Sequence, residues 1–311
     1  MSRQEIRYEE RLLPYKERFS QGATIVPRNF YFITAPTANE LAGQEFYART
    51  DPEQAEEAKA PYREIFLEST VETEFVFRTA LSKNILPFQV VNLPYILLPM
   101  RKEDGGYRLK SAAELKQLGY RRIADWFFKA EEEWEKQRGA KAARQSLYQR
   151  LNYQNELLKQ NPETEFLVLY NAAGTNLASA LLELRHQDKP FFAEHKTYWA
   201  IVQTANEGYY LVSVLNSNKV NEVVKPFQSM GLLGERDIEK KVLEAPIPQY
   251  SGKDPAHRRL AALGVKAASK VADYTKSSDL PSSLARRRAA ARQLAAQELA
   301  EIDEIVDKLF A

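Results

Sequence analysis

The fold is decided by residues 197–217, which read TYWAIVQTANEGYYLVSVLNS. Thr197–Thr204 is rich in β-branched and aromatic residues, and this composition predicts a strand. Asn206 is a residue type that caps helices, and it predicts a helix over Glu207–Leu215. Upstream, the apolar run Phe166–Tyr170 predicts a second, buried strand. Strands that stand directly beside a helix indicate a mixed α and β fold.

The chain before this region contains short strands and turns. Pro27–Ile33 is a loop that leads into a strand rich in aromatic residues. Further strands are predicted at Phe75–Arg78, Phe88–Val91 and Tyr95–Pro99. The pair Gly105-Gly106 follows the last of these and predicts a hairpin turn.

The segment 111–160 is predicted to be helical. It begins with a capping-box pattern, Ser111 with Glu114. Apolar residues then recur at steps of four, three and four, which places them on one helix face. They are Ile123, Phe127, Ala130 and Trp134, and the spacing returns after Gly139 at Leu147, Leu151, Gln154 and Leu158.

The C-terminal segment is also predicted to be helical. Asp254-Pro255 is a helix start, with Pro255 at the first helical position. A second helix follows the polar break Ser277–Ser283. It carries a heptad seam of the coiled-coil type, made of Ala295, Leu299, Ile302, Val306 and Leu309. Together with the strands, these helices predict a mixed α+β fold: a small twisted sheet, interrupted and followed by long helices.

Composition excludes several kinds of site. The chain has 311 residues, no Cys and only 3 His. Disulfides, thiolate zinc sites, iron–sulfur clusters and cysteine nucleophiles are thereby excluded, and a metal site is not expected. The N-terminal segment lacks the apolar core of a signal peptide and no apolar run would span a bilayer, so a cytoplasmic protein is expected. The net charge of +2 gives no general sign of a nucleic-acid binder.

Two motifs bear on catalysis, and neither is expected to act. Asn92-Leu93-Pro94-Tyr95 is similar to the tetrapeptide of amino-methyltransferases, but Leu93 stands where the tight turn needs proline, and no glycine-rich turn precedes it to hold S-adenosylmethionine. Glu194-His195-Lys196 fits the last element of a metal-dependent nuclease site, with Asp188 as a partner at an unusually short separation. No phosphate-binding loop and no nucleophile elbow occurs. No catalytic residue is therefore predicted.

Binding signals are better than catalytic ones. Arg28 stands beside Phe30, Tyr31 and Phe32, a combination that suits phosphate contact and base stacking, although a strand with core aromatics explains it more simply. Residues 225–241 combine cations, amides and glycines in one loop, which suits contacts to bases and phosphates. The basic start of the last helix (Arg286, Arg287, Arg288 and Arg292) is compatible with a DNA backbone contact. The candidate DNA-binding residues are Arg28, Lys196, Lys225, Gln228, Ser229, Arg236, Lys240 and Lys241.

A series of short segments occurs in the order found in one family. They are Pro27–Phe32, Val71–Glu72, Ile85–Phe88, Tyr170–Thr175, His195–Trp199, Glu207–Ser217, Gly231–Ile238 and Ala245–Pro248. The chain resembles the C-terminal target recognition region of bacterial and archaeal adenine-N6 DNA methyltransferases, including type IIG restriction–modification enzymes. More distantly, it is similar to type I specificity subunits, which place a coiled-coil spacer where the heptad helix stands.

The resemblance implies that this chain recognises double-stranded DNA for a restriction–modification system. Residues 1–110 and 161–250 would be two parts of a recognition domain, 111–160 a helical connector and 251–311 a C-terminal helical spacer. The methyltransferase domain that the family carries upstream is not expected within these 311 residues. A methyltransferase domain or subunit is therefore the expected partner, and S-adenosylmethionine would bind there and not to this chain. Two alternatives remain open: a protein–protein scaffold that uses the helices, or a degenerate methyltransferase or nuclease fragment.

Overall fold

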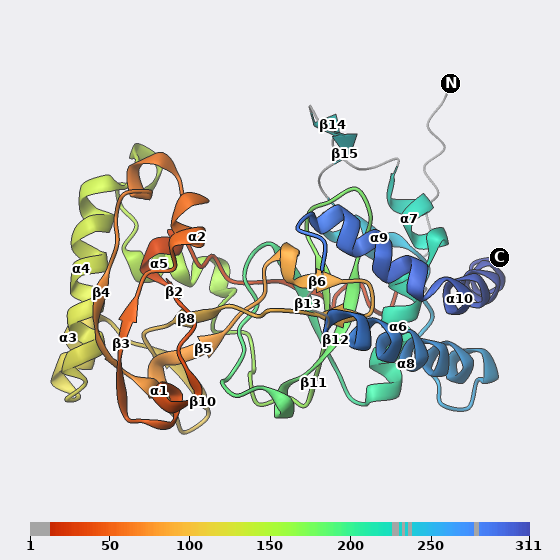
Figure 1. The fold of residues 1–311 in the computed structure, drawn as a ribbon, viewed down its shortest axis with the longest axis horizontal. Coiled ribbons are helices and arrows are strands. Elements are labelled where there is room, and N and C mark those ends of the chain that lie inside the picture. The colour runs from red at the N-terminus through yellow and green to blue at the C-terminus, as the bar shows by residue number, and fades with distance from the viewer. Residues whose placement is uncertain (1–12, 226–229, 232–233, 236–237, 277–279) are drawn as a thin grey trace.

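The computed structural model describes residues 13–225, 230–231, 234–235, 238–276 and 280–311. Within them the chain forms two lobes that lie side by side (Figure 1). Both lobes combine helices with small antiparallel sheets, so the expected mixed fold class is confirmed. None of the helices in the described ranges has the length and apolar character needed to cross a membrane.

The first lobe, on the left of Figure 1, is built around aromatic side chains. Its strands make a three-stranded sheet of order β2-β8-β5 and the pairs β3-β4 and β9-β10. Their bounds are β2 (Phe32–Ile33), β3 (Glu45–Arg49), β4 (Glu68–Glu72), β5 (Val76–Arg78), β8 (Tyr95–Leu97), β9 (Met100–Glu103) and β10 (Gly106–Leu109). Phe30, Tyr31 and Phe32 have no exposed surface. The aromatic residues beside Arg28 therefore fill the core and cannot stack on bases.

The predicted hairpin at Gly105-Gly106 is present and joins β9 to β10. The two glycines have φ of +86° and +120°, values that favour glycine because it lacks a Cβ atom. The strand predicted over Tyr95–Pro99 is shorter than expected. It ends as β8 at Leu97, and Pro99 has no N–H group to continue a ladder.

Five helices belong to this lobe, among the described residues. They are α1 (Ala38–Ala42), α2 (Pro52–Glu56), α3 (Ala112–Gln117), α4 (Arg121–Gln137) and α5 (Leu147–Leu151). The capping box of Ser111 and Glu114 starts α3 as predicted. The apolar face of α4 is buried in the lobe core, and the Trp126 Nε1 donates to the Phe30 carbonyl at 2.9 Å. The second helical run is shorter than predicted, because Gln154 has a φ of +53°, outside the helical region.

The second lobe contains a four-stranded antiparallel sheet of order β1-β13-β11-β12. The strands are β1 (Ser20–Gln21), β11 (Phe166–Asn171), β12 (Ser179–Glu183) and β13 (Thr197–Val202), and the short pair β6 (Ile85–Leu86) and β7 (Gln89–Val90) packs against β12. Side chains alternate between the two faces, as the pleat requires. Val168 and Tyr170 join the core under the helices, whereas Leu167 and Leu169 join a smaller core with Ile85.

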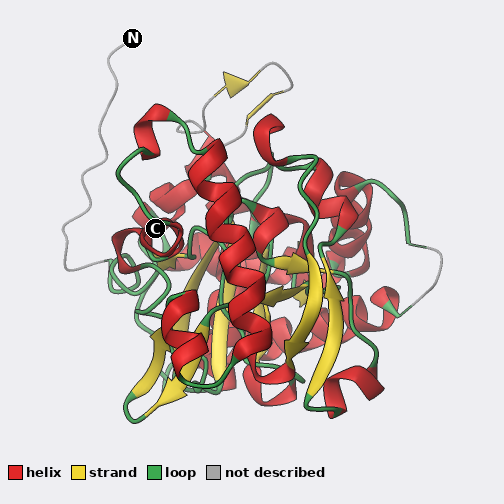
Figure 2. Ribbon diagram, turned by 90° about the vertical axis from the view of Figure 1, so that its left-hand side faces the viewer, coloured by secondary structure: helices red, strands yellow, loops and turns green. Residues whose placement is uncertain are grey.

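Helices cover one face of this sheet (Figure 2). They are α6 (Ala205–Asn216), α7 (Asn218–Val224), α8 (Pro255–Thr275), α9 (Leu284–Leu294) and α10 (Ala296–Leu309). The predicted cap of α6 at Asn206 is wrong: the Thr204 hydroxyl accepts from the Glu207 N–H at 3.2 Å, so the helix starts earlier. Gly264 lets α8 cross α6 closely, since a Cβ atom there would lie 2.6 Å from the Tyr209 carbonyl oxygen.

The heptad seam lies inside the chain. Ala295, Leu299, Ile302 and Val306 are buried in the core of the second lobe, where α10 contacts α6, α7, α8 and α9. The predicted single last helix is two helices, because Ala295 departs from helical geometry with φ −92° and ψ 14°. The remaining pair, β14 (Met230–Gly231) and β15 (Gly234–Glu235), forms a separate small ribbon.

Candidate nucleic-acid interface

Chain segments from both lobes meet at a short 3-10 turn, η5 (Ser82–Asn84). The Ser82 hydroxyl donates to the Lys196 carbonyl at 2.6 Å, and Arg288 on α9 donates to the Ser82 carbonyl, also at 2.6 Å. Asn84 fixes the turn from within, since its Oδ1 accepts from the Leu81 N–H at 2.8 Å. This turn therefore gathers basic residues that are far apart in the sequence.

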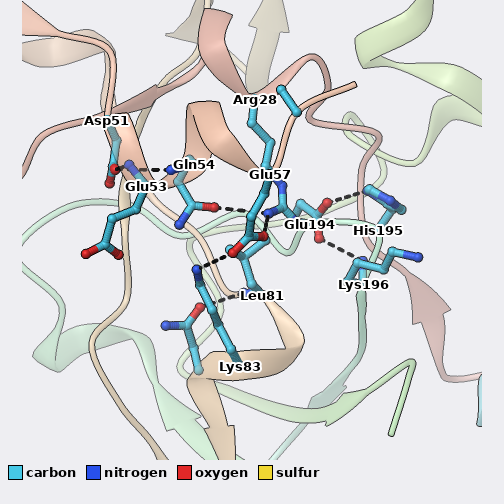
Figure 3. A network of polar contacts seen from close by, with 12 residues as sticks. Arg28, Asp51, Glu53, Gln54, Glu57, Leu81, Lys83, Glu194, His195 and Lys196 are labelled. Carbon is cyan, nitrogen blue, oxygen red and sulfur yellow. Dashed lines mark hydrogen bonds and ion pairs between the residues drawn. The ribbon is translucent and has the colours of Figure 1, made fainter. Parts of the chain in front are cut away.

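A carboxylate links this turn to the first lobe (Figure 3). Glu57 follows α2, and its Oε1 pairs with the Lys83 Nζ at 2.9 Å. Its other oxygen pairs with Arg28, and Arg28 also donates to the Gln54 Oε1 at 3.1 Å. Burial would raise the pKa of the Glu57 carboxyl, but hydrogen bonds and charges of Lys83 and Arg28 outweigh it and lower the pKa. Glu57 is thus an anion held between two cations.

The predicted Glu194-His195-Lys196 motif forms a tight turn beside η5. Glu194 has no exposed surface; one carboxylate oxygen accepts from the Lys196 N–H at 2.8 Å, and the other lies against the His195 Nδ1. Asp188 is elsewhere, in an ion pair with Arg78 at 2.8 Å. In the part of the chain that the structure describes, no group of three metal-ligating side chains is found.

The Asn92–Tyr95 motif lies at an open depression of about 360 Å³ that Arg78, Asn92, Leu93 and Gln187 line with others. Tyr95 is only 8% exposed. Its hydroxyl donates to the Asp188 Oδ2 at 2.6 Å, and the Arg78 guanidinium lies 3.3 Å from its ring centroid. Arg78 covers one face of the ring and the residue is nearly buried, so Tyr95 offers little ring surface for stacking on a flipped base.

Arg288 and Arg292, two of the four arginines near the start of the predicted last helix, donate hydrogen bonds to oxygen atoms within the chain. Arg288 donates to the carbonyls of Ser82 and Ile85, and burial lowers its pKa to about 10. Arg292 donates to the Asn216 carbonyl at 2.9 Å and to the Asn218 Oδ1 at 2.6 Å. These two side chains hold α9 against the second lobe, and among the four arginines only Arg286 is exposed.

The candidate DNA-binding residues divide into three groups. Arg28 is 13% exposed and engaged with Glu57, whereas Lys196 and Lys225 are exposed. Gln228, Ser229 and Arg236 lie outside the described residues. Lys240 and Lys241 lie in the 3-10 segment η10 (Glu239–Glu244).

Sequence reasoning did not select Lys83 or Glu57. Lys83 stands alone between two strand signals, and Glu57 is one of several acids in a polar segment. Only the folded chain brings them to 2.9 Å from one another. An isolated cation in a short connection between strands is the single signal that sequence offered.

Comparison with known proteins finds likeness among solved structures. No family model matches the chain, and no curated protein matches it. Among solved structures, the chain is similar to the Type IIL restriction-modification enzyme MmeI in complex with DNA, with a TM-score of 0.50 and 13% identity. The match covers 93% of this chain and 32% of that enzyme. The chain therefore shares a fold with a portion of a restriction–modification enzyme and spans about a third of its length.

Proposed function

We propose that this chain recognises a specific double-stranded DNA sequence as part of a restriction–modification system. The observation that carries the proposal is the likeness over 93% of the chain to part of an enzyme that is bound to DNA. The gathering of basic residues from distant segments at η5 agrees with it, because Lys and Arg supply the phosphate contacts that set a protein's register on a duplex.

The finer assignment follows the family resemblance. The system would be an adenine-N6 DNA methyltransferase of the type IIG kind, and this chain would supply specificity but no catalytic residue. Its loops, including residues 225–241, would read base edges in the groove. A methyltransferase domain or subunit would bind S-adenosylmethionine, flip the adenine and transfer the methyl group. The chain itself would bind no cofactor.

The scaffold alternative relied on the heptad seam and on the long central helices to dock a partner. The seam is not available for this purpose, because four of its five residues are buried in the chain's own core. The fifth, Leu309, is partly buried against the same core. A spacer role for these helices remains part of the proposal, but through surfaces other than the seam.

Selection from a random duplex library tests the proposal. The full chain should enrich one sequence, and fluorescence anisotropy should then show that this duplex binds at least tenfold more tightly than a scrambled duplex of equal length. The double variant Lys225→Ala with Arg236→Ala should weaken binding and flatten the dependence of log K on log salt. Failure to enrich any sequence would overturn the proposal.

A cofactor control separates this proposal from the degenerate-enzyme alternative. The melting temperature of the chain should not change on addition of S-adenosylmethionine, because a ligand stabilises only a protein that binds it. A saturable rise in melting temperature would instead favour a methyltransferase fragment.

A further inference from the structure

Glu57 lies between two cations that come from different lobes. Arg28 belongs to the first lobe, where its guanidinium also lies 5.8 Å from the Phe32 ring centroid. Lys83 belongs to η5, which leads into β6 and the core of the second lobe. Figure 3 shows both side chains directed at the Glu57 carboxylate. The carboxylate thus links the lobes through two hydrogen-bonded ion pairs.

The geometry of this contact is that of an oxyanion site. Arg28 approaches one carboxylate oxygen and Lys83 the other, an arrangement that also suits two oxygens of a phosphodiester, since arginine and lysine both bind phosphate. Gln54 and the Phe32 ring hold the guanidinium in place independently of Glu57. The cation pair would therefore persist if the carboxylate moved away.

Glu57 is partly exposed to solvent although it is paired with two cations. Its side chain is 48% exposed, and it follows the last residue of a five-residue helix. Partly exposed ion pairs contribute little to stability, because water screens them and two long side chains lose freedom. Exchange of this carboxylate for another anion therefore costs little free energy.

The surroundings favour a polyanion over a small one. Lys196 is exposed, and its carbonyl is bonded to Ser82, next to Lys83. The Lys196 side chain is directed away from Glu57 (Figure 3), so only an extended anion, such as a strand of linked phosphates, could contact both Lys196 and the Arg28–Lys83 pair. A single inorganic phosphate would reach only the Arg28–Lys83 pair.

We propose that Arg28 and Lys83 form a binding site for a DNA backbone phosphate, and that Glu57 occupies this site in the free protein and is displaced when duplex DNA binds. The inference rests on the proposed function. It assigns Glu57 a role that weakens binding: each duplex must displace an internal anion before the two cations can contact phosphate.

Neutralising Glu57 tests the proposal. In anisotropy titrations with one fixed duplex over a range of salt concentrations, Glu57→Gln should raise the affinity about threefold to tenfold and steepen the salt dependence by about one counterion. The matched control is Glu163→Gln, which removes a similarly exposed carboxylate from an ion pair with Lys102 in the β9–β10 hairpin. It should leave affinity and salt slope at the wild-type values.

Lys83→Gln provides a second, independent variant. It should lower the affinity for the duplex and make the affinity less dependent on salt. The double variant Glu57→Gln with Lys83→Gln should lose the increase in affinity that Glu57→Gln alone produces. This variant decides the matter if Glu57→Gln does not fold. If both Glu57→Gln and Lys83→Gln bind the duplex as the wild type does, the phosphate site is overturned and the proposed function still stands. No duplex binding by any of the proteins would overturn both.

Discussion

Two groups of basic residues in this chain have opposite uses. The arginines of α9 form the densest basic run in the sequence, yet Arg288 and Arg292 point inward and bond to carbonyl oxygens. The basic residues around η5 are scattered in sequence, yet Lys83 is partly exposed, Lys196 is exposed, and both lie at the junction of the lobes. A basic run therefore identifies a DNA contact only if its side chains are free of internal partners.

The largest expected effect is on stability, at Arg288. Arg288→Ala would leave the carbonyls of Ser82 and Ile85 without their charged donor, at a cost of about 2–4 kcal/mol in the free energy of unfolding. Urea denaturation measures this cost. Arg286→Ala, which changes an exposed residue of the same helix, should change stability by less than about 0.5 kcal/mol. Equal effects of the two variants would show that α9 is not held by Arg288.

The next effect concerns the ion pair that Asp188 makes with Arg78. Burial would raise the pKa of Asp188, but hydrogen bonds from Arg78 and Tyr95 outweigh it and lower the pKa below its ordinary value. A folded pKa below the unfolded one stabilises the fold above the unfolded pKa, and this stabilisation is lost as the pH falls through the folded pKa. Asp188→Asn should therefore cost about 1 kcal/mol at pH 7, since the pair is partly exposed.

Stability as a function of pH checks this assignment. The difference between wild type and Asp188→Asn should shrink as the pH falls below about 4. Glu165→Gln is a suitable control, because its pair with Arg185 is exposed on both sides. A difference that stays constant down to pH 2 would show that the charge of Asp188 is not what matters.

The smallest expected effect is at Lys196. Lys196→Gln should leave the unfolding free energy nearly unchanged, because the Lys196 backbone, not its ammonium group, makes the described bonds to Ser82 and Glu194. The affinity of this variant for duplex DNA should fall, and the slope of log K against log salt concentration should be less steep by about 0.9. Lys102→Gln in the hairpin is the control. A wild-type salt dependence in the Lys196→Gln variant would show that this residue does not contact DNA.

The sequence predicts local structure well where apolar spacing or a capping side chain alone determines it. The face of α4 formed by Ile123, Phe127, Ala130 and Trp134 is buried as its spacing indicated, and Asp254 and Ser111 cap their helices as predicted. The sequence does not predict strand β12 (Ser179–Glu183), because its alanine and leucine residues favour a helix. Pairing with β11 overrides that local preference, and such pairing is not visible in the segment itself.

The candidate site could be predicted only in part. Arg28 was selected from its neighbours in sequence, but the aromatic residues thought to assist it are core residues. Glu57 and Lys83 became visible only in the fold, since 26 residues separate them in the chain. Their chemical types are common on any surface, and proximity alone gives them meaning.

By itself the sequence determined the mixed fold class, the helix caps at Ser111 and Asp254, the hairpin and the lack of cysteine chemistry, because each depends on residue type or on spacing within a few positions. Tertiary structure alone decided which cations are free. Whether an arginine is exposed or bonded to a carbonyl depends on segments such as Ser82 and Arg288, which are 206 residues apart. Charge is a property of the sequence, but its availability is a property of packing.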